Sequence, residues 1–126
     1  MSCIRSAYIH IPFCVSKCLY CDFTSFSASE SQIDRYVEAL ILEMRRFAEF
    51  ESIQSAGVLP ALKTLYIGGG TPSLLSNNHI FRIVDTVRAL FGFVPDPEIT
   101  VEMNPNTSGI DFLNSFIEAG GNRVSL

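Results

Sequence analysis

The chain has 126 residues, 48% apolar and 17% charged, which is enough for one domain with a substantial buried core. Its net charge is −4 and no basic stripe stands out, which argues against nucleic acid as the main partner. There is no apolar run of roughly 18 residues and no signal-peptide or transit-peptide pattern, so we expect a cytoplasmic protein that does not span a membrane.

The first predicted elements are a strand and a long helix on either side of a cysteine-rich loop. Residues 7–11 alternate in polarity, which predicts a strand with Tyr8 and His10 on one face and apolar side chains on the other, ended by Pro12. A helix is predicted over 31–50, because apolar residues recur there at spacings of three and four: Ile33, Tyr36, Val37, Leu40, Ile41, Met44 and Phe47.

The rest of the chain continues the alternation. A second strand is predicted over 62–67 and runs directly into three glycines. A third is predicted over 98–103, and "NRVSL" (122–126) begins a fourth. The two helices that follow the second and third strands are bounded by capping residues: Ser76 and Gly92, and Ser108 and Gly120.

The order β-α-β-α-β-α-β predicts an α/β fold with parallel strands and right-handed crossovers. Both an open sheet and a (β/α) barrel are compatible with this order. Four strands cannot close a barrel, which usually needs about 250 residues. We therefore expect residues 1–126 to be a single incomplete domain, truncated within its fourth strand.

Three cysteines in the loop after the first strand predict a metal centre. Cys14, Cys18 and Cys21 are soft thiolate ligands for zinc or an iron–sulfur cluster, and Phe23 occupies a position where a fourth cysteine could stand. Three thiolates on a four-iron cluster would leave one iron free to bind a small molecule. The alternatives are a zinc site completed by His10 or Cys3, or plain buried cysteines.

Two further features point to a ligand site at the strand ends. The "IGGGTP" stretch (67–72) lies where parallel strands bind ligands, although a glycine run is also typical of a tight turn. Glu102 lies within a predicted strand, where a carboxylate needs a partner. It could accept hydrogen bonds from a ribose, or form a structural salt bridge with Arg123.

Taken together, these motifs resemble the radical S-adenosylmethionine (radical SAM) superfamily. The motif C-x3-C-x-aromatic-C is met by Cys14, Cys18, Tyr20 and Cys21. The stretches "YIHIPFC", "GGGTP", "EMNP" and "NRVSL" are similar to relatives of oxygen-independent coproporphyrinogen III oxidase. The resemblance implies the N-terminal portion of a partial (β/α)6 barrel, which in this family is followed by a smaller C-terminal domain.

The resemblance also implies the cofactors. Cys14, Cys18 and Cys21 would hold a [4Fe-4S] cluster whose unique iron binds the amino and carboxylate groups of S-adenosylmethionine. An electron from the cluster would then cleave S-adenosylmethionine to methionine and a 5′-deoxyadenosyl radical. The implied contacts of S-adenosylmethionine are Tyr8 and Tyr20, Gly69, Gly70 and Thr71 at its methionine end, and Glu102 at its ribose.

Phe23 separates two branches of this family. Oxidases that decarboxylate coproporphyrinogen III carry a further cysteine at that position, so the sequence resembles instead the HemW-type branch of heme chaperones. The resemblance implies heme as cargo, with its main determinants downstream of Leu126, and membrane-associated heme proteins as recipients. A coproporphyrinogen III oxidase of porphyrin synthesis and a structural zinc-binding module are the alternative functions.

Overall fold

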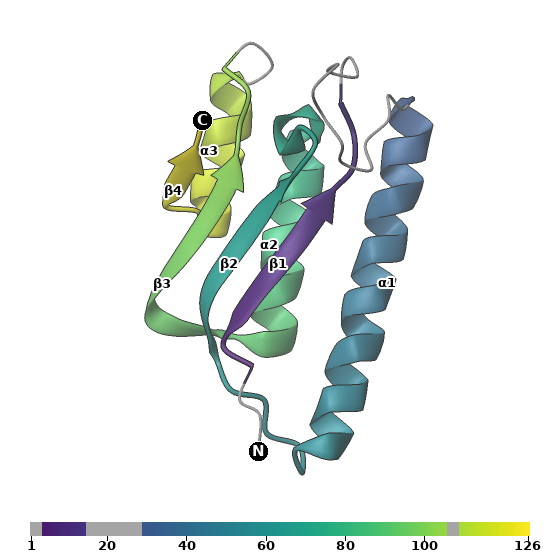
Figure 1. The fold of residues 1–126 in the computed structure, drawn as a ribbon, viewed down its shortest axis with the longest axis vertical. Helices are drawn as coiled ribbons and strands as arrows, with labels where there is room; N and C mark the ends of the chain where they lie inside the picture. Colours follow the sequence, from purple (N-terminus) through teal and green to yellow (C-terminus); the bar gives the residue numbers. More distant parts are fainter. Residues whose placement is uncertain (1–3, 15–28, 106–108) are drawn as a thin grey trace.

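The structure is a computed structural model that describes residues 4–14, 29–105 and 109–126. Four strands form one parallel sheet in the order β1-β2-β3-β4, and all of them point the same way in Figure 1. The strands are β1 (Ser6–Ile11), β2 (Leu62–Gly69), β3 (Phe93–Glu102) and β4 (Arg123–Ser125). Within the described part of the chain, no helix is long and apolar enough to cross a membrane.

Three α-helices cover one face of this sheet, and no described helix covers the other face. They are α1 (Glu30–Gln54), α2 (Asn77–Phe91) and α3 (Ile110–Ala119), and a 3₁₀ turn, η1 (Pro72–Leu74), precedes α2. Side chains of all three helices join one buried cluster with alternate residues of the strands. On the sheet side of that cluster Ile9, Ile67 and Val101 lie in register across β1, β2 and β3.

The strand order distinguishes the two architectures that the sequence allowed. A doubly wound open sheet reverses its strand order and carries helices on both faces. Here each right-handed crossover adds the next strand on the same side, so the order follows the chain and the helices share one face. The α/β prediction is confirmed, and the arrangement is that of the first part of a (β/α) barrel.

The structure corrects the predicted start of β3 and the predicted N-cap of α3. Strand β3 begins at Phe93, five residues earlier than predicted, because Pro95 and Pro97 made that stretch look like a loop. The β2–β3 register shifts there, between Leu62 and Thr64. Helix α3 has Gly109 at its N-cap, without a side-chain cap, instead of the predicted Ser108, which lies outside the described residues.

Helix α1 begins directly after the cysteine loop and is fixed to α2 near its start. Ser29 and Gln32 form a capping box at its N-terminus. Side chains on two successive turns of α1 then contact side chains of α2. Oδ1 of Asp34 lies 2.6 Å from Nε2 of His79, and Oε1 of Glu38 lies 2.6 Å from Nη1 of Arg82. These contacts orient the end of the helix that follows the loop.

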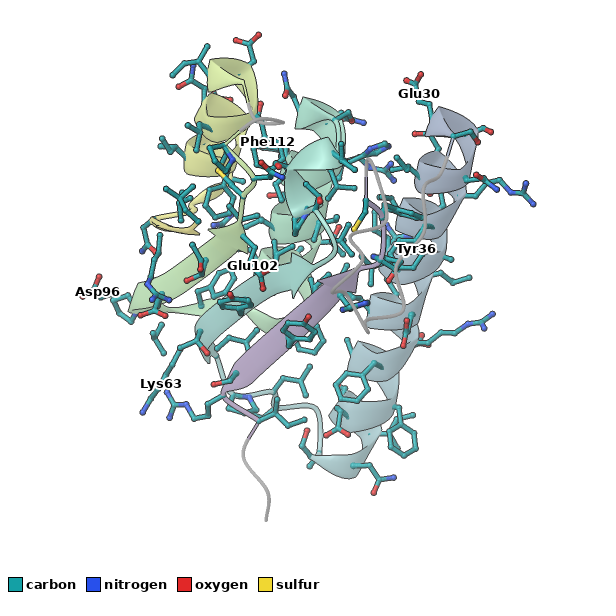
Figure 2. The ribbon with its side chains drawn as sticks, turned by 45° about the horizontal axis from the view of Figure 1, so that its top comes forward. Glu30, Tyr36, Lys63, Asp96, Glu102 and Phe112 are labelled. Carbon is teal, nitrogen blue, oxygen red and sulfur yellow. The ribbon has the colours of Figure 1, made fainter. Side chains whose placement is uncertain are left out.

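Tyr36 of α1 protects the outer edge of β1. Its hydroxyl donates a hydrogen bond to the backbone carbonyl of His10, and Figure 2 shows it between α1 and the end of that strand. Burial, and then the charges of Glu43 and Tyr8, raise the pKa of Tyr36 above its ordinary value of 10.0. The bond gives α1 a polar contact to the strand and satisfies a carbonyl on an edge that could otherwise pair with another chain.

Stability should therefore fall at alkaline pH. Because folding raises the pKa of Tyr36, its stabilising effect is complete below pH 10.0 and is lost as the pH rises through the folded-state pKa. We expect Tyr36→Phe to lower the free energy of unfolding by about 1 kcal/mol near neutral pH, because one hydrogen bond is lost. The variant should also lose less stability than the wild type between neutral pH and about pH 10.5 in urea titrations. An equal loss in both proteins would contradict this role.

Candidate functional site

The uncovered sheet face carries polar and aromatic side chains in register. Tyr8, Tyr66 and Thr100 lie side by side on β1, β2 and β3. One level nearer the carboxyl ends, His10 pairs with Gly68 and Glu102 pairs with Ser125. In Figure 2 Glu102 lies at the upper part of the sheet, near the strand ends. Because the residues between them point into the core, the alternation brings these side chains to one surface.

The first two glycines of the "GGG" run make room for the side chains of Glu102 and His10. A Cβ on Gly68 would lie 2.2 Å from Oε1 of Glu102, and one on Gly69 would lie 2.8 Å from Nδ1 of His10. Gly69 also has a φ of +119°, which disfavours any side chain. These distances are shorter than real contacts, so glycine is required for close approach.

Gly70, the third glycine of the run, faces Cys14. A Cβ on Gly70 would lie 2.9 Å from Sγ of Cys14 and 2.5 Å from the carbonyl oxygen of Phe13. The amides of Gly70 and Thr71 donate to the carbonyls of Ile11 and Phe13, at 2.7 and 2.6 Å. The N–H donors at these two positions are therefore already used, and the Thr71 carbonyl accepts from the amide of Leu74, so the carbonyl oxygens of the glycines are the backbone groups considered for a ligand.

Cys14 is held at this end of the sheet by the chain before it. Phe13 is buried and packs edge to face on Tyr36, with ring centroids 5.2 Å apart. Cys14 is half-buried and forms no disulfide. Cys3, Cys18, Tyr20 and Cys21 lie outside the described residues, so the structure places one of the three predicted cluster ligands. Within the described ranges no three metal-binding side chains come together.

Glu102 has no ion-pair partner among the described residues. The structural salt bridge considered for it is not formed, because Arg123 lies 3.5 Å from Glu98 instead. A cavity of about 140 Å³ opens at the ends of β2, β3 and β4 and is lined by Gly70, Thr71 and Glu102. Its other lining residues are Pro72, Met103, Asn104, Ser125 and Leu126. A partly buried carboxylate beside such a cavity can accept two hydrogen bonds from a diol.

Tyr8 is more than half exposed and is oriented by two neighbours. Its ring stacks on Tyr66, with centroids 6.0 Å apart and planes 19° apart, and its hydroxyl lies 3.0 Å from Nδ1 of His10. Burial, and then the charges of Glu102 and Tyr66, raise the pKa of Tyr8 above 10.0. The structure therefore brings Tyr8, Gly69, Gly70, Thr71, Glu102 and Cys14 towards one end of the sheet, and their roles as cluster and cofactor contacts stay predictions.

Sequence reasoning placed His10 on this surface, beside Tyr8, but missed Tyr66, which it treated only as part of a predicted strand. The alternation of "LKTLYI" places Tyr66 opposite Leu65 and Ile67, on the face shared with Tyr8. That signal could have found it, once the parallel register between β1 and β2 was assumed.

Comparison with known proteins identifies the family. The Radical SAM superfamily profile matches residues 8–126. The chain belongs to this superfamily. The heme chaperone HemW of Escherichia coli (strain K12) is 41% identical over 122 residues, which cover 96% of this chain and 31% of that protein. The anaerobilin synthase of Escherichia coli O157:H7 is 36% identical over 122 residues, covering 97% of this chain and 26% of that protein.

A solved structure of a radical SAM enzyme shares this fold. Coproporphyrinogen III oxidase (HemN) from Escherichia coli, which its description calls a radical SAM enzyme, superposes with a TM-score of 0.82 and 31% identity. The match covers 94% of this chain and 26% of that one. The chain thus spans about a third or less of the length of these relatives, and it matches a portion of the radical SAM barrel.

Proposed function

We propose that this chain carries the cluster-binding and cofactor-binding part of a heme chaperone of the radical SAM superfamily. One observation carries the proposal: the glycine run lies between Sγ of Cys14 and the carboxylate of Glu102, and its lack of side chains lets both approach. This brings a thiolate ligand and a ribose acceptor to one strand end. The name of the HemW relative supports the heme-related part of the proposal.

The residues fit a [4Fe-4S] cluster held by Cys14, Cys18 and Cys21. Thiolates are the usual ligands of such clusters, and Cys14 stands beside the loop that would face the cluster. When bound and reduced, the cluster supplies the electron for reductive cleavage of S-adenosylmethionine. Iron and sulfide analysis separates this site from the alternative, a structural zinc module.

The same end of the sheet fits S-adenosylmethionine. Glu102 would accept the ribose hydroxyls, and Tyr8 and Tyr20 would lie along the cofactor. At the methionine end Gly69 and Gly70 would offer carbonyl oxygens to the ammonium group, because the amides of Gly70 and Thr71 are already bonded. Thr71, whose carbonyl accepts from the amide of Leu74, would line this end of the site. This division assigns ribose recognition to a side chain and ammonium recognition to the backbone.

The heme chaperone is favoured over a coproporphyrinogen III oxidase by Phe23, which stands where the oxidases carry a further cysteine. The oxidase remains the second candidate, because the solved relative bears that name and shares the fold. The proposed site of action is the cytoplasm, with heme passed to membrane-associated heme proteins.

The heme chaperone and the oxidase predict opposite results for heme binding and for coproporphyrinogen III turnover in the full-length protein. We expect the reconstituted protein to bind heme in an absorbance titration and to leave coproporphyrinogen III unchanged under anaerobic conditions with S-adenosylmethionine and a reductant. The products are separated by chromatography. Decarboxylation of coproporphyrinogen III without saturable heme binding would favour the oxidase instead.

A further inference from the structure

The two ring nitrogens of His10 have different environments. Nδ1 lies 3.0 Å from the hydroxyl of Tyr8, whereas Nε2 has no hydrogen-bond partner among the described residues. The ring lies close to Gly69, and the backbone of His10 is held by the bond from Tyr36 to its carbonyl. A histidine fixed in this way presents one free nitrogen at the carboxyl end of β1.

We propose that His10 is an additional cofactor-binding residue whose Nε2–H donates a hydrogen bond to the carboxylate of S-adenosylmethionine. The inference rests on the proposed function. In this arrangement the hydroxyl of Tyr8 donates to Nδ1 of His10, and the ring proton is therefore on Nε2. The hydrogen bond at one ring nitrogen fixes which nitrogen carries the proton.

The surroundings of Tyr8 support this direction of the bond. A tyrosine phenol is protonated at neutral pH, and burial and then the charge of Glu102 raise the pKa of Tyr8 further, so its hydroxyl has a proton to donate. Among the described residues, Nδ1 of His10 is the one acceptor recorded for that hydroxyl. Stacking on Tyr66 keeps the phenol ring in place beside β2.

The position of His10 indicates the carboxylate as its acceptor. His10 lies against Gly69, at the start of the loop proposed to contact the methionine end. The ammonium group can be bound by loop carbonyls, but the carboxylate needs a donor, and the amides of Gly70 and Thr71 are engaged. Two of the side-chain donors that line the 140 Å³ cavity, Asn104 and Ser125, lie on the Glu102 side, where the ribose is expected, and the third, Thr71, adjoins Gly70 on the β2 side. On the β1 side the free ring nitrogen of His10 supplies an N–H donor.

Two substitutions separate the roles of the nitrogens in the full-length, reconstituted protein. Glutamine places an amide N–H near the position of Nε2, whereas asparagine reaches only the position of Nδ1. We expect His10→Asn to weaken S-adenosylmethionine binding by roughly tenfold or more, and His10→Gln to remain within about threefold of the wild type. Decarboxylated S-adenosylmethionine should bind the wild type and His10→Asn equally.

A second measurement tests the tautomer without the cofactor. In cluster-free protein labelled with ¹⁵N-histidine, long-range proton–nitrogen spectra should show His10 protonated on Nε2, with the signal assigned by its loss in His10→Asn. Tyr8→Phe should change the Nδ1 signal, because that nitrogen loses its donor.

The outcomes keep the two proposals distinguishable. If the wild type binds no S-adenosylmethionine, the proposed function fails. If the wild type and His10→Asn bind S-adenosylmethionine equally well, the assignment of His10 is overturned while the function stands. The same holds if His10→Asn loses affinity for S-adenosylmethionine and for its decarboxylated form alike. Loss of iron from His10→Asn would place its role at the cluster and would also overturn the assignment.

Discussion

Cys14→Ala is expected to leave the full-length protein without a [4Fe-4S] cluster after anaerobic reconstitution. Cysteine thiolates hold the irons of such clusters. With Cys14 removed, only two of the three proposed thiolate ligands remain, which is too few to hold the cluster firmly. The wild type should contain about four irons and four sulfides per chain, and the variant close to none. Iron and acid-labile sulfide analysis, together with the brown absorbance near 400 nm expected for such clusters, measures the difference.

Gly70→Ala extends this test to the loop that faces the cysteine. The added Cβ would lie 2.9 Å from Sγ of Cys14 and 2.5 Å from the carbonyl of Phe13, so the cysteine must move. We expect cluster content to fall in this variant. Cys3→Ala is the matched control and should retain the full cluster. A protein that binds one zinc and needs Cys3 for it would contradict the cluster assignment.

Glu102→Gln is expected to weaken binding of S-adenosylmethionine while leaving the cluster intact. A hydrogen bond to a charged group contributes about 1.5–3 kcal/mol, so the affinity should fall roughly 10- to 100-fold. Gly68→Ala should have a similar effect, because its Cβ would lie 2.2 Å from Oε1 of Glu102 and would displace the carboxylate. Binding is measured by equilibrium dialysis of the labelled cofactor.

A neighbouring glutamate provides the control for charge. Glu98 lies on the same strand but pairs with Arg123 at the surface, with both side chains more than half exposed. Glu98→Gln should therefore change the affinity by less than about twofold, since exposed ion pairs contribute little. If Glu98→Gln weakens binding as much as Glu102→Gln, the effect is one of net charge, and Glu102 does not contact the cofactor.

Local patterns predicted most of this fold. The alternation of residues 7–11 gave the faces of β1 correctly, with Ile9 and Ile11 buried and Tyr8 exposed. Helix α1 was predicted from its apolar spacing, although it extends to Gln54. Strand β3 was predicted too short, because a proline is tolerated in a strand only where the pairing is irregular, which local sequence does not reveal. Here the irregular pairing at Leu62 accommodates the stretch that contains Pro95 and Pro97.

The contacts within the site could not be read from local patterns. That Gly68, Gly69 and Gly70 face Glu102, His10 and Cys14 depends on the register between three strands. The sequence alone also left open whether Glu102 pairs with Arg123, since both lie on neighbouring strands. In the structure Arg123 lies beside Thr100, with Glu98 and Glu102 one step away on either side along β3, and it pairs with Glu98.

Electron paramagnetic resonance of the reduced, reconstituted full-length protein tests the central claim most directly. The claim is that three cysteines hold a [4Fe-4S] cluster beside a binding site for S-adenosylmethionine. The predicted result is the spectrum of a reduced four-iron cluster that changes when S-adenosylmethionine is added, with the change reduced in Glu102→Gln at subsaturating cofactor. A spectrum that S-adenosylmethionine leaves unaltered at any concentration, or a protein that holds zinc and no iron, would contradict the account.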